Sequence, residues 1–72
     1  MYKIYSQLNC VYCELARSAL NENNIEFMEI KLDTPEKKQS FKDEGFKTVP
    51  QIYDEKGMHI GGWNELRKKL YD

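Results

Sequence analysis

Two cysteines three positions apart, Cys10 and Cys13, are the residues of this chain whose type and spacing point most directly to chemistry. They follow a short strand-like segment and stand at the start of a helical one. Cysteines at this spacing occur as half of a zinc site, as a structural disulfide and as a redox-active pair. The rest of the sequence has to distinguish these three uses.

A zinc site needs further ligands beside such a pair. Structural zinc is usually held by four cysteine or histidine side chains, and His59 is the only other residue of these two types. The chain therefore does not complete a zinc site by itself, although a site shared between two chains stays open, and we expect no bound metal. We interpret His59 as a surface residue of a short strand.

Length, charge and hydropathy indicate what kind of protein carries the two cysteines. The 72 residues suffice for one small domain, expected to span 1–72 as a monomer. Eleven basic and twelve acidic side chains leave a formal net charge of −1, which gives no electrostatic basis for binding nucleic acid. No apolar segment approaches the ~20 residues that span a bilayer, and no signal peptide is recognisable, so we predict a cytoplasmic protein without a membrane partner.

A structural disulfide fits this setting poorly. Permanent disulfides are rare in the cytoplasm. A disulfide that closes so short a loop also removes little conformational entropy from the unfolded chain. The cysteine pair is therefore interpreted as redox-active.

The spacing of apolar residues predicts seven elements. In chain order they are a strand at 2–5, a helix at 11–23, a strand at 25–32, a helix at 35–44, a hairpin formed by 49–53 and 58–60, and a final helix from 63. Thr34 and Pro35 are a typical N-cap and first residue for the second helix. That helix offers mainly Phe41 as an apolar contact, so we expect it to be largely exposed.

The order β-α-β-α-β-β-α predicts an α/β fold. The first two strands and the helix between them should form a right-handed crossover with parallel strands. The hairpin should add antiparallel strands, which gives a four-stranded mixed sheet flanked by helices on both faces. The apolar residues at helical spacing in the first helix are Leu15, Ala16, Ala19 and Leu20, and we expect them to face this sheet.

The predicted start of the first helix gives the two cysteines different tasks. Free backbone N–H groups and the helix dipole at that point stabilise a thiolate on Cys10. Cys13 lies nearly one turn further into the helix, within reach of a disulfide but more shielded. A C-x-x-C segment after a strand of a βαβ unit is typical of a thioredoxin-like redox motif.

Three segments together resemble the glutaredoxin family of the thioredoxin superfamily, and the short bacteriophage glutaredoxins in particular. They read "CVYC", "TVPQIY" and "HIGGWNEL", and they occur in the family's order and spacing. The resemblance implies the thioredoxin fold, glutathione as cosubstrate and a redox-active disulfide between Cys10 and Cys13. One departure is Val11, because the family usually carries proline at the second position of the cysteine motif.

The same resemblance implies a glutathione groove around the cysteines. Pro50 would follow a cis peptide bond and face the disulfide, and Val49, next to Thr48, would offer its backbone to the thiol peptide like an added strand. Tyr12 would wall the groove. Gln7 stands where many members carry a basic residue for the glycine carboxylate of glutathione, and Lys47 is a possible substitute for that charge.

The family also binds the γ-glutamyl end of glutathione at its paired-glycine turn. Gly62 would present backbone N–H groups to the carboxylate, because a helix start is a ready anion site. Asn64 and Glu65 stand where many members carry Ser or Asp followed by Asp; Asn64 is equally well interpreted as a helix cap. Trp63 is interpreted mainly as a packing residue whose edge borders the groove.

The favoured function is a glutathione-dependent thiol–disulfide oxidoreductase, a dithiol glutaredoxin that reduces protein disulfides and glutathione mixed disulfides. Cys10 would attack and Cys13 would resolve, with disulfide-containing proteins such as ribonucleotide reductase as partners. One alternative is a redoxin that thioredoxin reductase reduces directly. Another is an iron–sulfur carrier in which Cys10 and glutathione bridge a cluster between two chains.

Overall fold

The seven predicted elements are all present in the computed structural model, which describes residues 1–72. Their bounds in chain order are β1 Tyr2–Ser6, α1 Val11–Glu22, β2 Phe27–Lys31, α2 Pro35–Asp43, β3 Gln51–Tyr53, β4 His59–Gly61 and α3 Trp63–Tyr71. Thr34 is the N-cap of α2, with its hydroxyl accepting a hydrogen bond from the Lys37 amide, and Pro35 is the first helical residue. The predicted start of this helix is confirmed.

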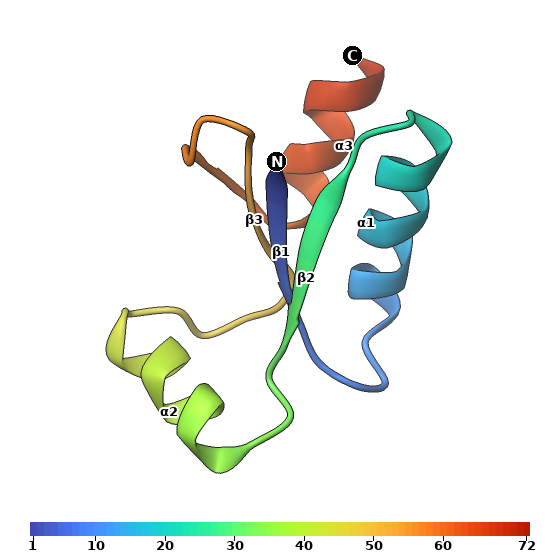
Figure 1. Cartoon of the computed structure of the whole chain (residues 1–72). Coiled ribbons are helices and arrows are strands. Elements are labelled where there is room, and N and C mark those ends of the chain that lie inside the picture. The colour runs from blue at the N-terminus through green and yellow to red at the C-terminus, as the bar shows by residue number, and fades with distance from the viewer.

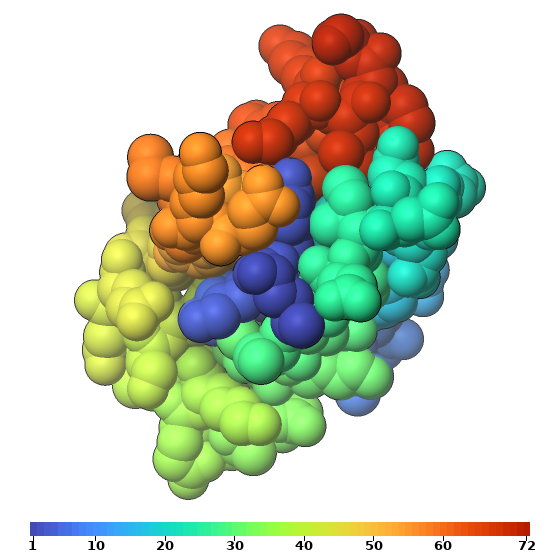
Figure 2. All heavy atoms as spheres, turned by 45° about the horizontal axis from the view of Figure 1, so that its top comes forward, coloured from blue at the N-terminus to red at the C-terminus, as the bar shows by residue number.

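The four strands form one mixed sheet in the order β2-β1-β3-β4. β1 pairs in parallel with β2, and Ile4 lies opposite Glu29. On its other side β1 pairs antiparallel with β3, where Ile4 lies opposite Ile52. Figure 2 shows the blue start of β1 at the surface between the orange hairpin and the green segment that leads into β2. The thioredoxin-like topology predicted from the sequence is confirmed.

The main core lies between the sheet and the helix pair α1 and α3. Alternate residues of β1 are buried on this face, and Ile4 is fully buried. Leu20 from α1 and Leu66 from α3 meet it there and are fully buried too. Each such side chain contributes roughly 1.5–3 kcal/mol through its burial. This core holds the start of α1, and therefore the cysteine pair, against the end of β1.

The opposite face of the sheet carries α2 (Figure 1). A row of aromatic rings lies between this helix and the sheet. Phe41 is the single buried residue of α2, as expected for a largely exposed helix. Its ring lies 5.8 Å from that of Tyr5 on β1 and 5.1 Å from that of Phe46. Phe46 in turn contacts the ring of His59 at 5.4 Å between centroids. α2 therefore packs on the sheet mainly through aromatic contacts.

Several bounds differ from the prediction by one or two residues, and so does one core position; β3, for instance, begins at Gln51 rather than at Val49. β2 begins at Phe27 rather than Ile25, because Asn24 has a φ of 56° and the Ile25 amide donates back to the Leu20 carbonyl, which ends α1. Leu15 is 40% exposed, so its predicted core position is wrong. At 100° per residue Leu15 lies at the edge of the buried stripe.

No helix is long and apolar enough to span a bilayer.

Candidate active site

Cys10 is the N-cap of α1, as the sequence predicts. Its backbone is extended, with φ −116° and ψ 104°, and its Sγ accepts a hydrogen bond from the Cys13 amide at 3.2 Å. Its carbonyl accepts the first intrahelical bond, from the Glu14 amide, at 3.1 Å. The sulfur therefore occupies the place of a capping oxygen, where helix N–H groups favour negative charge.

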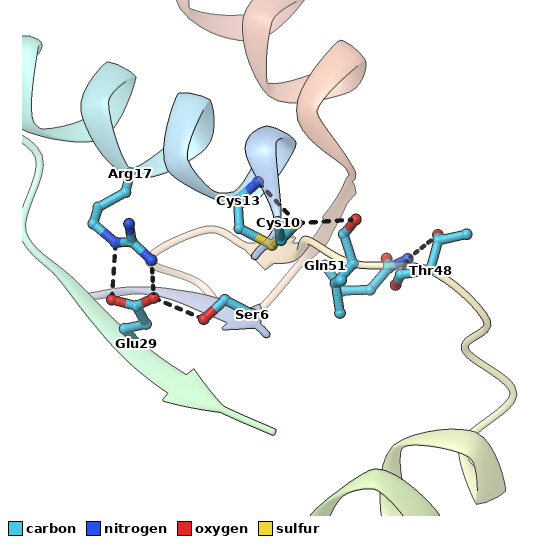
Figure 3. Close-up of a disulfide and its surroundings, with 8 residues drawn as sticks. Ser6, Cys10, Cys13, Arg17, Glu29, Thr48 and Gln51 are labelled. Atoms are coloured by element: carbon cyan, nitrogen blue, oxygen red, sulfur yellow. Dashed lines mark hydrogen bonds and ion pairs between the residues drawn. A yellow bond between two sulfur atoms is a disulfide. The ribbon is translucent and has the colours of Figure 1, made fainter. Parts of the chain in front are cut away.

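Cys10 and Cys13 form a disulfide, with their Cα atoms 5.2 Å apart (Figure 3). Cys13 is fully buried, whereas Cys10 is only partly buried. Of the two cysteines, Cys10 is therefore the one that a substrate can approach. The difference in shielding expected from the sequence is confirmed.

The segment before β3 faces the disulfide. The Val49–Pro50 peptide bond is cis, as the family resemblance implies. The Val49 carbonyl oxygen lies 3.9 Å from Cys10 Sγ, so the two segments meet although they are 39 residues apart in the chain. The Val49 backbone thus borders the reactive sulfur.

A network of hydrogen bonds that the sequence did not indicate holds this segment in place. The Gln51 amide nitrogen donates to the carbonyl and hydroxyl oxygens of Thr48 at 3.0 and 3.2 Å, as Figure 3 shows. Its Oε1 lies 2.7 Å from His59 Nε2 and accepts the proton of that nitrogen. Gln51 is only 8% exposed, and a buried amide needs such partners. His59 is exposed, as interpreted, but it also takes part in this hydrogen-bond network.

Most of the predicted groove residues line one cavity of about 480 Å³, which includes Val49, the neighbour of Cys10 Sγ, but neither cysteine. From the predicted set they are Tyr12, Thr48, Val49, Pro50, Gly62, Trp63, Asn64 and Glu65, joined by Gln51, His59 and Gly61. Gln7 does not belong to them, because it lines a neighbouring cavity together with Lys47. The structure therefore brings three separated segments together and leaves the predicted site of the glycine carboxylate outside this cavity.

The paired-glycine turn starts α3 two residues earlier than a cap at Asn64 requires. Gly62 is the N-cap and Trp63 the first helical residue, so the interpretation of Asn64 as the cap is wrong. The carboxylate of Glu65 reaches back to accept a hydrogen bond from the Gly62 amide at 2.6 Å. Trp63 packs against the main core and also lines the cavity, so both of its expected roles have a structural basis.

A polar network lies beside the disulfide on the sheet (Figure 3). The hydroxyl of Ser6, which is fully buried, donates to Glu29 Oε2 at 2.7 Å. Arg17 donates to both carboxylate oxygens of Glu29, through Nε at 3.0 Å and through Nη2. The hydrogen bond from Arg17 lowers the pKa of Glu29, against the opposing effect of burial and with help from Ser6. Glu29 is thus held as a carboxylate beneath α1.

Comparison with known proteins identifies the family. The model of the glutaredoxin family matches residues 3–60. The chain belongs to the glutaredoxin family. Glutaredoxin 1 of Rickettsia conorii is 40% identical over 67 residues, which cover 88% of this chain and 65% of that protein. This glutaredoxin domain therefore spans slightly less than two thirds of that relative's length.

Solved structures agree with this assignment. Glutaredoxin 1 of Francisella tularensis superposes with a TM-score of 0.83 at 36% identity, covering 94% of this chain and 88% of that one. A buckwheat glutaredoxin, solved as a glutathione complex, superposes with a TM-score of 0.80 at 23% identity over 94% of this chain and 66% of that one. The second likeness supports the glutaredoxin fold alone. The expected similarity to the bacteriophage subgroup stays a prediction.

Proposed function

We propose that the chain is a glutathione-dependent thiol–disulfide oxidoreductase in which Cys10 is the nucleophile and Cys13 the resolving thiol. The observation that carries this proposal is the asymmetry of the pair. Cys10 is partly exposed, and its sulfur caps a helix and lies beside the Val49 carbonyl, whereas Cys13 is fully buried. Membership of the glutaredoxin family supports the same chemistry.

The reduced protein acts on a substrate disulfide in two exchanges. The Cys10 thiolate attacks one sulfur of the substrate, a bond forms between them, and the other substrate sulfur leaves as a thiolate that takes up a proton. Cys13, after losing its proton, then attacks the Cys10 sulfur and expels the second substrate thiolate, which also takes up a proton. The substrate has gained two electrons and two protons, and the protein holds the disulfide seen in the structure.

Two glutathione molecules restore the dithiol. The first thiolate attacks Cys10, forms a mixed disulfide and releases Cys13. The second attacks the glutathione sulfur of that mixed disulfide, so oxidised glutathione leaves and the Cys10 thiolate returns. The cavity beside Cys10 is the site proposed for glutathione, with the Val49 backbone along its thiol end and the Gly62 turn at its γ-glutamyl end.

A coupled assay tests the proposal. The protein is supplied with reduced glutathione and glutathione reductase, and in parallel with thioredoxin reductase, using a small glutathione mixed disulfide and a protein disulfide as substrates. Oxidation of NADPH only with the glutathione system supports the proposal. Turnover only with thioredoxin reductase contradicts the proposal and supports the alternative, a redoxin that thioredoxin reductase reduces directly. Ribonucleotide reductase is one protein acceptor to include, and its reduction would support the proposed partner.

A further inference from the structure

The segment 47–50, between α2 and β3, forms no hydrogen bond with the rest of the backbone. It lies outside the helices and strands, and none of the backbone hydrogen bonds in loops, turns and caps involves it. Yet it carries the Val49 carbonyl oxygen that lies 3.9 Å from Cys10 Sγ. A thiol peptide that runs along this backbone needs it at a fixed place. Groups other than the backbone therefore have to hold the segment.

The side chain of Gln51 supplies the hydrogen bonds that the segment otherwise lacks. Its Nε2 donates to the carbonyl and the hydroxyl of Thr48 at 3.0 and 3.2 Å (Figure 3). A carbonyl oxygen can only accept, so this contact fixes which end of the Gln51 amide faces Thr48. Gln51 Oε1 then lies 2.7 Å from His59 Nε2, and that nitrogen has to carry the proton of the bond. The orientation of the amide thus depends on a donor at His59.

His59 is exposed, but its ring packs against two neighbours. Tyr53 lies opposite His59 in the pairing of β3 with β4, with the ring centroids 5.0 Å apart. The ring of Phe46 lies 5.4 Å away. These contacts hold the imidazole so that Nε2 faces Gln51, which a surface histidine free to rotate would not do.

We propose that His59 is a positioning residue of the exchange reaction and acts through Gln51 on the segment 47–50. The inference rests on the proposed function and names a residue that determines how well a peptide thiol reacts at Cys10. Without the donor at His59, Oε1 of Gln51 is left unpaired in a side chain that is only 8% exposed. An unpaired buried oxygen is unfavourable, so the amide turns to find another donor and its bonds to Thr48 weaken.

The expected effect concerns peptide thiols in particular. Glutathione is a peptide, and its backbone can pair with that of Val49 as an added strand would. A small thiol without peptide groups, such as 2-mercaptoethanol, makes no use of that backbone. Loss of one neutral hydrogen bond corresponds to roughly a three- to tenfold change in a rate or binding constant. We expect His59→Phe to slow reduction of the disulfide by glutathione by about this factor, and reduction by 2-mercaptoethanol by less than about twofold.

Reduction of the oxidised protein by the two thiols tests the proposal. Each thiol is mixed with the protein, and the loss of the disulfide is followed by timed quenching and alkylation of the freed cysteines. The readout is the ratio of the two second-order rate constants, glutathione over 2-mercaptoethanol, each expressed per thiolate. A general loosening of the fold changes the access of both thiols to Cys10 and cancels in this ratio. Gly57→Ala is the control, because it strains the turn between β3 and β4 at a φ of 82° and should keep the ratio.

Variants of the two network residues separate the hydrogen bond from the ring. His59→Phe keeps an aromatic ring but has no donor, whereas His59→Gln loses the ring but offers an amide donor and should recover most of the ratio. Gln51→Met should lower the ratio as His59→Phe does. The double variant should fall no lower than either single one, because both changes break the same connection.

Three results would overturn the proposal. One is a ratio that His59→Phe leaves unchanged, and another is an equal fall in His59→Phe and His59→Gln. The third is a double variant whose loss is the product of the two single losses. His59 lines the same cavity as Gln51, and such a product would mean that it meets glutathione independently of Gln51.

The same measurements separate this inference from the proposed function. An unmodified protein that reacts no faster with glutathione than with 2-mercaptoethanol, per thiolate, would contradict the proposed glutathione site. The positioning role is then decided by amide chemical shifts of the oxidised proteins, recorded without any thiol. Shifts of Thr48 and Val49 that move in His59→Phe and return in His59→Gln support it. Shifts that stay unchanged in His59→Phe overturn it.

Discussion

The Glu65 carboxylate accepts a hydrogen bond from the Gly62 amide at 2.6 Å, across the turn that starts α3. The same side chain leaves no room beside Gly61. A Cβ atom at Gly61 would lie 2.7 Å from Glu65 Oε1 and 2.8 Å from its Cγ. The turn therefore needs glycine at Gly61 for space, and its φ of 125° needs glycine for conformation.

Gly61→Ala should accordingly destabilise the protein more than Gly57→Ala. Gly57 also has a positive φ, of 82°, but a Cβ there would meet no atom within 4 Å. We expect a loss of about 1–2 kcal/mol in the free energy of unfolding for Gly57→Ala, from conformation alone. The loss for Gly61→Ala should be larger by about 1 kcal/mol or more, because overpacking is added. Chemical denaturation of both variants measures the difference.

A double variant identifies the source of that extra loss. Glu65→Ala removes the Oε1 and Cγ atoms that a Cβ at Gly61 would strike. Alone it should cost about 0.5–1.5 kcal/mol, through the lost hydrogen bond to Gly62. Combined with Gly61→Ala it should cost less than the sum of the two single changes. Additive losses would show that the close approach of Glu65 is not what restricts Gly61.

The thiolate of reduced Cys10 should form at lower pH than an ordinary thiol. The Cys13 amide points at Cys10 Sγ from 3.2 Å, and the start of α1 adds the helix dipole. In the Cys13→Ser protein, the absorbance of the thiolate should rise with a midpoint below the usual ~8.5. The Cys10→Ser protein is the control, because its remaining thiol is fully buried and should ionise at higher pH. A reversed order of the two midpoints would contradict the assignment of the nucleophile.

The sequence predicted the fold better than the details of the site. The spacing of apolar residues and the turn residues suffice to predict the order of helices and strands, because both are local properties of the sequence. Side-chain hydrogen bonds across the fold are not local: Gln51 holds Thr48 and accepts from His59, yet each of these residues alone looks like an ordinary strand or loop residue. The signal in the sequence was a polar residue, Gln51, among the apolar residues of a predicted strand. Gln7 stands at the position where many family members carry a basic residue, but it lines a neighbouring cavity rather than the one that contains Val49.

Stability in acid should depend on Glu29. Its folded-state pKa lies below the ordinary value of 4.5, because Arg17 and Ser6 hydrogen-bond to the carboxylate. A depressed pKa means that the stabilisation is fully present above pH 4.5 and is lost as the pH falls through the folded-state pKa. Glu29→Gln should therefore lower stability at neutral pH and flatten the decline in acid. Midpoints of urea unfolding between pH 7 and pH 2 measure this.

Asp33→Asn is the matched control for that measurement. The pKa of Asp33 is lowered as well, first through its hydrogen bond to Lys37, but the two side chains are 53% and 52% exposed. Solvent and salt screen such a pair, so the effect on stability should be small and should shrink further in salt. Parallel acid profiles for Glu29→Gln and the unmodified protein would mean that the network beneath α1 contributes nothing to acid stability.

The two cysteines should fail in different ways when each is replaced by serine. Cys10→Ser should abolish activity on every substrate, because the remaining Cys13 is fully buried. Cys13→Ser should keep activity on a small glutathione mixed disulfide, since a second glutathione can release that product from Cys10. It should lose most reduction of a protein disulfide, roughly tenfold or more, because resolution by a neighbouring thiol at high effective concentration is gone. The rates of both variants on both substrates, with the same supply of glutathione, test these assignments. An active Cys10→Ser protein together with an inactive Cys13→Ser protein would show that Cys13, not Cys10, is the nucleophile.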